Sequence, residues 1–386
     1  MNILFLGYFP FIASDGGIQR VTDTLTKEFI KKGHNVYFLC VDDPEELYPG
    51  YITSAPQYFI NRNCGNWKEK IHQLLQKHNI NYIVHQGPTS ITTQIISDLD
   101  LKIKIISVFH TQPFLNDEVT RKQIYMSRTY NFKQFCFKYL SYIFPFLRRI
   151  VFGYYERKNI IAATEISDKI CFISERFFPR VLKHIPNIPK DKMVAINNPN
   201  SFDVCHSSLQ KENIVLWVGR IDNANKNTID FVKVWNLIYK NNPSWKAIVA
   251  GVGFDFDVIK KYVQNNHIKN IELIGDCKNI QELYKKSKFV VVTSYSESWC
   301  MVITEGLSQG CIPIAYDTFE TLHDIIKNDY NGFITKPNPK SMSFKLNEIM
   351  NNEILYQNIY QNTFESVNKY SVENISNSWI NLLSSI

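Results

Sequence analysis

The chain of 386 residues lacks the features that define several classes of protein. No stretch approaches the roughly 18 consecutive apolar residues that a membrane-spanning helix needs. The apolar amino terminus has neither a basic leader nor a small-residue cleavage site, so we expect a buried first strand rather than a signal peptide. There is no internal repeat and no low-complexity tract. What remains is an ordinary globular composition, 45% hydrophobic and 20% charged, at a length that suits two domains.

The eight cysteines are scattered, with no Cys-x-x-Cys pair and no zinc-like clustering with histidine. Most of them lie in apolar runs, such as residues 37–40 and 169–172. We therefore expect reduced cysteines in the core of a cytosolic protein.

Strand-like runs alternate with amphipathic helical stretches in both halves of the chain. The first helix is clear, because Val21, Leu25 and Phe29 recur at helical spacing before Gly33. The strand-like runs lie at residues 3–7, 35–40, 82–85, 103–109, 169–173, 192–196, 213–219, 246–250, 271–274, 289–293 and 312–315. This alternation is typical of parallel sheets that are covered by helices on both faces.

The alternation predicts an α/β chain with two Rossmann-like domains facing across a cleft, where ligands bind at the carboxyl ends of the strands. A polar stretch at residues 197–213 reads as the linker. The first domain would contain residues 1–198 and a returning helix at 367–386, and the second would contain residues 212–366.

The strongest chemical signal is the stretch SYSESWCMVITEGLSQG at residues 294–310. It reads as the end of a buried strand, a turn, and a helix that opens near Trp299 and ends at Gly310. A helix amino terminus offers free backbone N–H groups to a diphosphate, so we expect Trp299, Cys300 and Met301 to bind a nucleotide donor there.

Two glutamates of this stretch are candidate ligand contacts. Glu305, about two turns inside the helix, could accept hydrogen bonds from vicinal ribose hydroxyls. Glu297, in the loop before the helix, could face a transferred sugar. By spacing alone, a solvated loop glutamate and an exposed helical one explain the pair equally well.

The stretch 294–310 resembles the Glu-x7-Glu signature of the retaining GT-B glycosyltransferases, the large family 4 or group 1 type. The resemblance covers residues 213–335 closely and the amino-terminal half more loosely. Ser298, Cys300 and Gly306 depart from it, because the family usually has glycine, another small residue and alanine at these places. Further motifs that resemble the family are LWVGR at 216–220 with Lys226 after it, AGVG at 250–253, GCIPIAY at 310–316, HDII at 323–326 and NGFI at 331–334.

The resemblance implies a GT-B fold and retaining transfer of a hexose-type sugar from a UDP- or GDP-sugar. It implies a same-face displacement in which the acceptor protonates the leaving phosphate. The acceptor would be a saccharide or a lipid-linked saccharide, as in bacterial enzymes of lipopolysaccharide or capsule synthesis. The second domain would bind the donor and the first domain the acceptor.

Arg220 and Lys226 fit a role in this reaction. A departing nucleotide diphosphate gains negative charge, which cations and N–H dipoles must stabilise when no metal is bound. Taken alone, an ordinary surface Arg and Lys would be the better interpretation. Beside the strand-Gly-Arg motif, we expect both cations to contact the diphosphate.

Two places in the first half are further candidates. Gly16 and Gly17 join the first strand to the first helix, where glycines let a backbone approach phosphate, although a plain loop is the alternative. His110 follows a strand, where a satisfied structural histidine is the alternative. The resemblance implies that His110 hydrogen-bonds the transferred sugar and that the Gly16–Gly17 loop lies over the phosphates and acceptor.

Asp255 and Asp257 have the Asp-x-Asp form that metal-dependent glycosyltransferases use. Here the pair follows a Gly-x-Gly turn and reads as a helix start, where acidic residues favour the helix dipole. Phe256 occupies the place of the third glycine of a dinucleotide fingerprint. We therefore expect no metal site and no cofactor, with the nucleotide sugar as the substrate.

Negative charge is almost missing between Arg121 and Lys158. This stretch contains nine cations, twelve Phe or Tyr residues and a single acid, Glu156, while the whole chain has a net charge of +7. Pro145 divides it into two elements. Such composition favours an anionic membrane surface, with core packing of the aromatics and a nucleic-acid surface as alternatives; no nucleic-acid motif accompanies it.

The sequence thus predicts a metal-independent glycosyltransferase in the cytoplasm, bound peripherally to the inner face of the membrane. A non-catalytic nucleotide-sugar sensor or scaffold is the alternative, and a dinucleotide oxidoreductase is a more distant one.

Overall fold

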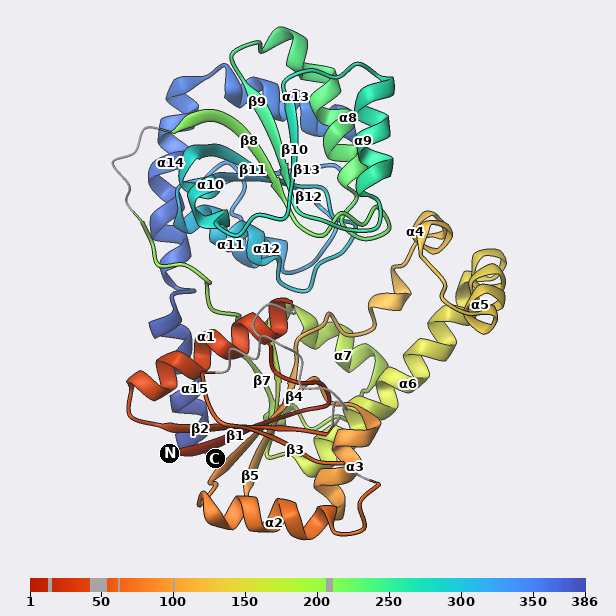
Figure 1. Ribbon diagram of the computed structural model, residues 1–386, viewed down its shortest axis with the longest axis vertical. Helices are drawn as coiled ribbons and strands as arrows, with labels where there is room; N and C mark the ends of the chain where they lie inside the picture. The colour runs from red at the N-terminus through yellow and green to blue at the C-terminus, as the bar shows by residue number, and fades with distance from the viewer. Residues whose placement is uncertain (13–15, 42–53, 62, 100, 206–210) are drawn as a thin grey trace. The chain divides into compact units, whose positions relative to one another are not determined.

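The computed structural model describes residues 1–12, 16–41, 54–61, 63–99, 101–205 and 211–386. These residues form two compact α/β units, each built around a parallel sheet (Figure 1). The first unit contains Met1–Glu118, Phe146–Ser201 and Val372–Ile386, and the second contains Val119–Pro145 and Phe202–Ser371.

One segment of the second unit differs from the division expected from the sequence. Residues 1–198 were expected in the first domain, but Val119–Pro145 groups with the second unit. Side-chain contacts explain this grouping, because Arg128 donates to the carbonyl oxygen of Phe254 at 3.0 Å. At the other end of the chain, Val372–Ile386 belongs to the first unit, where Lys32 donates to Asn377.

The first sheet has seven parallel strands in the order β3-β2-β1-β4-β5-β6-β7. Apolar side chains on one of its faces pack against α2 and α3 in a continuous core that includes Leu4, Leu39 and Ile83. On the other face, Phe5 stacks on Phe29 of α1. The strands are β1 (Asn2–Gly7), β2 (Asn35–Cys40), β3 (Gln57–Phe59), β4 (Tyr82–Gln86), β5 (Lys104–Phe109), β6 (Lys169–Phe172) and β7 (Met193–Ala195).

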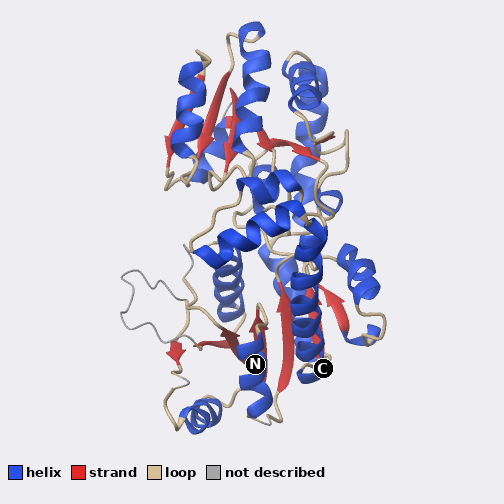
Figure 2. Cartoon of the chain, turned by 90° about the vertical axis from the view of Figure 1, so that its right-hand side faces the viewer, coloured by secondary structure: helices blue, strands red, loops and turns tan. Residues whose placement is uncertain are grey.

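Figure 2 colours the helices blue and the strands red, and most helices of the first unit connect one strand of its sheet to the next. They are α1 (Gly17–Lys31), α2 (Trp67–Lys77), α3 (Ser90–Asp98), η2 (Leu115–Asp117), α6 (Pro145–Ile166), η3 (Glu175–Phe177), α7 (Phe178–His184), η4 (Lys190–Lys192) and the returning α15 (Val372–Ser384). The long connection from β5 to β6 also contains α4 (Arg121–Met126) and α5 (Phe132–Ile143), which belong to the second unit.

The second sheet has six parallel strands in the order β10-β9-β8-β11-β12-β13. Its central strands β8, β11 and β12 are buried over most of their length, with alternate side chains on opposite faces of the sheet, whereas the edge strand β10 is partly exposed. In β8, Val215 and Trp217 join the core that α8 and α13 cover, whereas Ile214 and Leu216 join the core beside α10. The strands are β8 (Glu212–Val218), β9 (Lys246–Ala250), β10 (Ile271–Gly275), β11 (Ser287–Val292), β12 (Ile312–Tyr316) and β13 (Phe333–Thr335).

The helices of the second unit follow its strands in turn. They are α8 (Thr228–Ile238), η5 (Tyr239–Asn241), α9 (Phe256–Asn265), α10 (Ile280–Lys286), α11 (Met301–Ser308), α12 (Leu322–Ile325), α13 (Pro339–Met350) and α14 (Glu353–Asn368).

The prediction of two parallel α/β sheets is confirmed, and every strand-like run in the sequence corresponds to a strand. The first helix buries Val21, Leu25 and Phe29 as predicted. Two short strands, β3 and β13, were missed because three residues give too little periodicity to recognise. Pro145 does divide the basic segment, since α5 ends at Ile143 and α6 begins at the proline.

All eight cysteines are free. Cys40, Cys171, Cys300 and Cys311 are buried as predicted, whereas Cys64 is exposed and three others are half-buried. The expectation of core cysteines is therefore correct for half of them. An apolar run in the sequence therefore does not by itself place a cysteine in the core, since Cys136 lies between two phenylalanines and is only half-buried.

Candidate functional site

The first part of the site lies where β8 ends. Gly219 adopts a φ of 153°, and a Cβ on Gly251 would lie only 1.9 Å from its carbonyl oxygen. A Cβ on Gly253 would lie 2.3 Å from the carbonyl oxygen of Ile221. The loops after β8 and β9 therefore touch backbone to backbone, and glycine permits that approach. Arg220 projects from this junction, with 62% of its side chain exposed and Asp222 3.2 Å away.

Lys226 is held at the end of β11 by a short chain of hydrogen bonds. The indole N–H of Trp217 donates to the Thr293 hydroxyl at 3.2 Å. That hydroxyl in turn lies within hydrogen-bonding distance of the carbonyl oxygens of Lys226 and Asn227, at 3.2 and 3.0 Å. Thr293 follows β11, so the loop that carries Lys226 is attached to the carboxyl end of a central strand.

Lys226 and Glu297 form an ion pair, with Nζ 2.5 Å from Oε1. Ser294 donates to the same carboxylate oxygen at 2.7 Å. Only 28% of the lysine side chain and 11% of the glutamate side chain are exposed. The structure thus brings together two residues that lie 71 positions apart in the sequence.

The electrostatics of this pair keep the lysine charged. Burial is the largest single influence and lowers the pKa of Lys226, but the charge of Glu297, the hydrogen bond to its carboxylate and the nearby Cys300 together raise that pKa above its ordinary value. The charge of Arg220 lowers the pKa of Lys226, as expected for a neighbouring cation. A protonated Lys226 beside Arg220 makes this region suitable for an anionic ligand.

Helix α11 begins later than the sequence suggested. Its first residue is Met301, and Cys300 precedes it in the left-handed region with a φ of 59°. Glu305 consequently lies little more than one turn into the helix rather than two. Burial raises the pKa of the Cys300 thiol well above its usual value, so this thiol stays protonated beside the helix start.

Trp299 has a different place from the one its predicted role requires. Its ring is 2% exposed and packs edge-on against Tyr370, with the ring centroids 5.0 Å apart. A ligand beside it would therefore meet the backbone of residues 299–301 rather than the indole face. The backbone N–H groups at this helix start therefore remain candidate ligand contacts, whereas the Trp299 side chain does not.

Glu305 is buried rather than exposed, which removes the solvated alternative for this residue. The Tyr284 hydroxyl donates to its Oε2 at 3.1 Å. The next residue, Gly306, lets α11 pack directly on β11, since a Cβ there would lie 2.7 Å from Val290 Cγ1. The departure from alanine at this position thus has a packing reason.

In the first unit, His110 follows β5 and is buried. Its Nε2 is hydrogen-bonded to Gln86, which ends β4, and Asn198 lies beside the ring. Burial lowers the pKa of His110 to about 4, although the hydrogen bond with Asn198 opposes that shift. His110 is therefore a neutral imidazole at pH 7, able to hydrogen-bond but not to supply a positive charge.

A second buried histidine shows what a structural role looks like in this unit. His85 bonds Ser107 through Nδ1 at 3.1 Å and Thr92 through Nε2 at 2.6 Å, so both of its ring nitrogens are occupied within the core. Burial lowers the pKa of His85 to about 3.

Gly16 precedes α1 with a φ of 142°, a conformation that side chains other than glycine rarely adopt. Gly17 is the first residue of the helix, is exposed, and has no atom within 4 Å of a Cβ placed on it. Backbone groups here are open to a ligand. Asp15, which precedes them, lies outside the described residues.

The two aspartates of the Asp-x-Asp pair lie at the start of α9, where they have structural surroundings. Asp255 precedes α9 and accepts a hydrogen bond from the backbone N–H of Asn223 at 2.8 Å. Asp257 lies in the first turn of that helix. Within the described ranges, no group of three or more His, Cys, Asp or Glu residues comes together in a way that could hold a metal ion.

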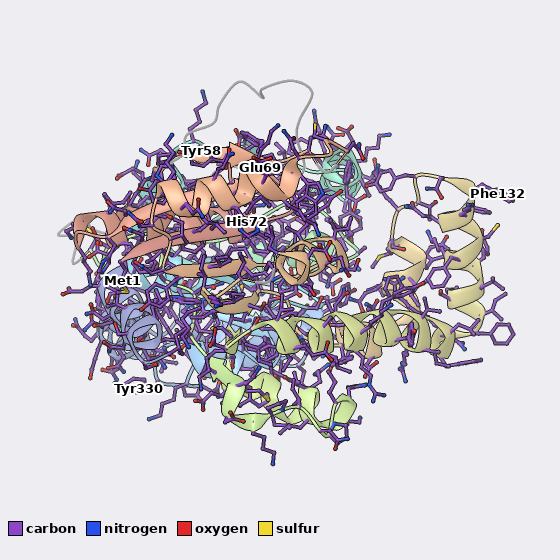
Figure 3. The ribbon with its side chains drawn as sticks, turned by 90° about the horizontal axis from the view of Figure 1, so that it is seen from below. Met1, Tyr58, Glu69, His72, Phe132 and Tyr330 are labelled. Carbon is purple, nitrogen blue, oxygen red and sulfur yellow. The ribbon has the colours of Figure 1, made fainter. Side chains whose placement is uncertain are left out.

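The basic segment exposes its aromatic residues. On α5, Phe132 is 78% exposed and Tyr139 55%, and Figure 3 labels Phe132 at the end of this helix. On α6, Phe146, Ile150 and Tyr154 recur every four residues and are each more than half exposed. The core-packing alternative is therefore wrong for most of the aromatics. In the described part of the chain, no helix combines the length and hydropathy of a membrane span.

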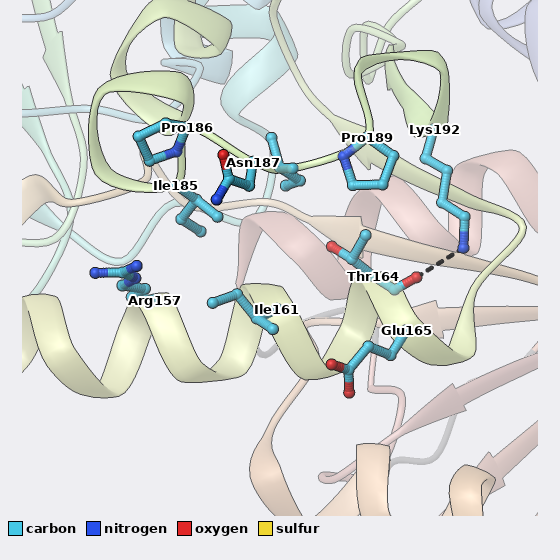
Figure 4. Close-up of a pocket in the computed structure, with 10 residues that line it drawn as sticks. Arg157, Ile161, Thr164, Glu165, Ile185, Pro186, Asn187, Pro189 and Lys192 are labelled. Atoms are coloured by element: carbon cyan, nitrogen blue, oxygen red, sulfur yellow. Dashed lines mark hydrogen bonds between the residues drawn. The ribbon is translucent and has the colours of Figure 1, made fainter.

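A cavity of about 420 Å³ lies in the first unit between α6 and the loop after α7. Ile161, Ile185 and Pro186 give it apolar walls (Figure 4), and Lys192 at its edge donates to the carbonyl oxygen of Thr164 at 2.9 Å. These residues precede β6 and β7, whereas His110 follows β5. The cavity therefore opens at the opposite edge of the sheet from the candidate residues.

Sequence reasoning missed several residues that complete the site. Ser294, Tyr284 and Asn198 each contact a predicted site residue, yet only Ser294 lay within a recognised motif. No local pattern could reveal Tyr284 or Asn198, because their partners are distant in the sequence.

Comparisons with known proteins agree with this architecture. A protein-family model described as "Glycosyltransferase Family 4" matches residues 15–200, and one described as "Glycosyl transferases group 1" matches residues 205–366. Among solved structures, the apo lipopolysaccharide outer core galactosyltransferase WaaB aligns over 100% of both chains with a TM-score of 0.69 and 15% identity. Anabaena HepE in complex with UDP aligns likewise with a TM-score of 0.73 and 14% identity.

The fold is thus that of the GT-B glycosyltransferases, with two parallel-sheet α/β domains. The chain belongs to the group 1, or family 4, glycosyltransferases, whose two family models together match almost all of its length.

Curated relatives are more distant. A Campylobacter jejuni GalNAc-alpha-(1->4)-GalNAc-alpha-(1->3)-diNAcBac-PP-undecaprenol alpha-1,4-N-acetyl-D-galactosaminyltransferase is 27% identical over 246 residues, 63% of this chain and 64% of that protein. A Bacillus subtilis poly(glycerol-phosphate) alpha-glucosyltransferase is 28% identical over 156 residues, 40% of this chain and 23% of that protein. The matched regions thus span less than two thirds of these relatives.

The glycine junction beside Arg220 gives a test of the site's construction. Gly251→Ala should lower the free energy of unfolding by about 3 kcal/mol or more, because strain and a backbone clash combine. Gly275→Ala is the matched control, since Gly275 also has a positive φ but no atom within 4 Å of an added Cβ. Its cost should be about 1–2 kcal/mol. Urea unfolding measures the free energy of unfolding of both variants. Equal losses of stability would contradict the close approach of Gly251 to the Gly219 carbonyl oxygen.

Proposed function

We propose that the chain is a retaining, metal-independent glycosyltransferase of bacterial cell-surface polysaccharide synthesis. It transfers a hexose-type sugar from a UDP- or GDP-sugar to a saccharide or lipid-linked acceptor. The observation that carries this proposal is the Lys226–Glu297 ion pair, with Arg220 beside it, before the start of α11. Two similar proteins support it: Anabaena HepE has been solved in complex with UDP and glucose, and the Campylobacter relative is named for a PP-undecaprenol-linked substrate.

In the proposed reaction, Arg220 and Lys226 stabilise the charge that develops on the departing diphosphate. Each charge-assisted hydrogen bond contributes about 1.5–3 kcal/mol. Free backbone N–H groups at the start of α11 and near Gly16 and Gly17 would add donors to the phosphates. Lys226 remains cationic at neutral pH because of its partner, so it needs no proton transfer before it acts.

The remaining candidates contact the sugars. Glu297 faces the transferred sugar, where charge changes during the reaction, and Glu305 accepts hydrogen bonds from the ribose hydroxyls. Tyr284 orients Glu305 through its hydroxyl. His110 contributes a hydrogen bond to the transferred sugar as a neutral imidazole, in keeping with its lowered pKa.

We expect Arg220→Ala and Lys226→Met each to lower kcat/KM for the nucleotide sugar about tenfold or more, because one charge-assisted bond to the leaving group is lost. Nucleotide release from a panel of UDP- and GDP-sugars measures turnover, and calorimetry measures the affinity for UDP and GDP. Lys260→Met, at an exposed lysine of α9, is the control and should keep wild-type values. Normal turnover and affinity in both site variants would mean that the donor binds elsewhere. Nucleotide-sugar binding without any turnover would favour a sensor or scaffold.

Full activity should persist in a strong chelator, because the cations proposed for the leaving group belong to the protein. Turnover before and after addition of EDTA, followed by excess Mg²⁺ or Mn²⁺, measures this. Loss of turnover that a metal ion restores would overturn the metal-independent mechanism and return Asp255 and Asp257 to consideration.

We further propose that α5 and α6 bind an anionic membrane surface, which would place the enzyme at the inner face of the cytoplasmic membrane near a lipid-linked acceptor. Each helix presents exposed aromatic residues together with exposed cations such as Lys133, Arg149 and Lys158. Basic helices with aromatic residues on the other face lie in the headgroup region of anionic bilayers. Lys138 and Arg148 contribute less, because they bond Ser127 and Asn116 within the protein.

Replacing Lys133, Arg149 and Lys158 with glutamine should weaken binding to anionic vesicles on the order of 100-fold, at about 1 kcal/mol for each cation. Co-sedimentation with vesicles of mixed anionic and neutral lipid measures the partition. The wild type should bind neutral vesicles less and leave anionic ones at about 1 M salt, where the Debye length falls to about 3 Å.

The matched control removes three charges elsewhere, at the exposed residues Lys77, Lys102 and Lys260. This triple variant should bind anionic vesicles as the wild type does. Equal weakening by both triple variants would show that net charge alone acts, and absence of binding by the wild type would remove the membrane proposal.

A further inference from the structure

Helix α4 belongs to the second unit although its sequence lies between two strands of the first sheet. In the α4 segment, defined as residues 121–128, two cations contact the rest of that unit: Lys122 on the helix and Arg128 just after it. The Lys122 ammonium lies 5.1 Å from the centroid of the Tyr295 ring. The Arg128 guanidinium lies 4.4 Å from the centroid of the Phe254 ring and 3.9 Å from the Asp255 carboxylate, besides donating to the Phe254 carbonyl oxygen.

The partner of Lys122, Tyr295, is connected to the loops of both members of the central ion pair. Tyr295 is two residues before Glu297, and its backbone N–H donates to the carbonyl oxygen of Asn225 at 2.8 Å. Asn225 immediately precedes Lys226. A shift of Tyr295 would therefore move the loop of Glu297 and the loop of Lys226 together.

The partners of Arg128 adjoin the other cation of the site. Phe254 and Asp255 follow Gly253, whose backbone touches Ile221, and the N–H of Asp255 donates to the carbonyl oxygen of Ile221 at 3.2 Å. Arg220 immediately precedes Ile221. The two cations of the α4 segment thus contact both loops on which the proposed chemistry depends.

We propose that Lys122 and Arg128 are positioning residues that fix the geometry of the Arg220, Lys226 and Glu297 loops. This inference rests on the function proposed above for those three residues. Lys122 is itself exposed, so its contact is too weak to hold the fold together. Instead, Lys122 narrows the range of positions that the loops of the site adopt. This matters for the rate, because catalysis is sensitive to misplacement of a reacting group by about 1 Å.

A basic composition alone does not give a cation of α4 an aromatic or acidic partner. Arg121, the neighbour of Lys122 on the same helix, is exposed and has no comparable ring or carboxylate partner among the described residues. The selective pairing of Lys122 with Tyr295, two residues from Glu297, is what assigns it a role in the site rather than a place on a basic surface.

The test compares Lys122→Met, which keeps the aliphatic stem, with Lys122→Arg, which keeps a cation over the ring. We expect Lys122→Met to lower kcat roughly fivefold, as loss of one cation–π contact allows. KM for the nucleotide sugar and the Tm should stay near wild-type values, and Lys122→Arg should restore kcat. Adding Arg128→Met to Lys122→Met should deepen the loss, whereas Lys260→Met should have no effect.

Amide hydrogen exchange gives a readout that does not need turnover. Residues 295–299 should exchange faster in Lys122→Met than in the wild type or Lys260→Met. Unchanged exchange and unchanged kcat in an active enzyme would overturn the positioning role, as would a parallel fall in Tm and kcat that arginine does not rescue. A wild type that turns over no nucleotide sugar would refute the proposed function instead, and the exchange result would still decide whether Lys122 orders the loop.

Discussion

The ion pair between Lys226 and Glu297 is the interaction on which the candidate site depends. A carboxylate that is only 11% exposed loses much of its hydration, and a cation 2.5 Å away compensates for that loss. Removing either partner would leave the other charge poorly solvated. The surrounding structure is consistent with this demand, because Ser294 adds a second donor to the carboxylate and Thr293 fixes the backbone that carries the lysine.

Backbone segments are also packed tightly beside this pair. Glycines at 219, 251 and 253 let the loops after β8 and β9 lie against each other, and this junction holds Arg220 close enough to influence the pKa of Lys226. Gly306 does the same for α11 on β11. An added Cβ would lie 1.9 Å from a neighbouring atom at Gly251, 2.3 Å at Gly253 and 2.7 Å at Gly306, whereas Gly219 is needed for its positive φ rather than for space.

Much of the fold could be predicted from the sequence, because apolar periodicity reports buried strands and helices directly. The candidate site was harder to predict from the sequence than the fold. Sequence placed Glu297, Lys226 and Arg220 on loops after strands, yet it could not show that the first two pair with each other. It also could not show that Trp299 turns into the core or that Glu305 meets Tyr284, since side-chain direction depends on packing between distant segments. Nor could it show that Val119–Pro145 groups with the second unit, because Lys122 and Arg128 contact partners more than a hundred residues away.

The exposed aromatic residues of α5 and α6 need a partner that tolerates cations. Each helix by itself exposes several large apolar side chains, and exposed apolar patches on monomeric proteins usually mark an interaction site. A second copy joined symmetrically through the same face would bring cations against cations, since the basic segment contains a single acidic residue. That residue, Glu156, already accepts the backbone N–H of Phe114 at 2.8 Å, and burial raises its pKa. An anionic bilayer supplies apolar depth for rings such as Phe132 and Tyr154 and phosphates for Lys133 and Arg149, so it matches both parts of the surface at once.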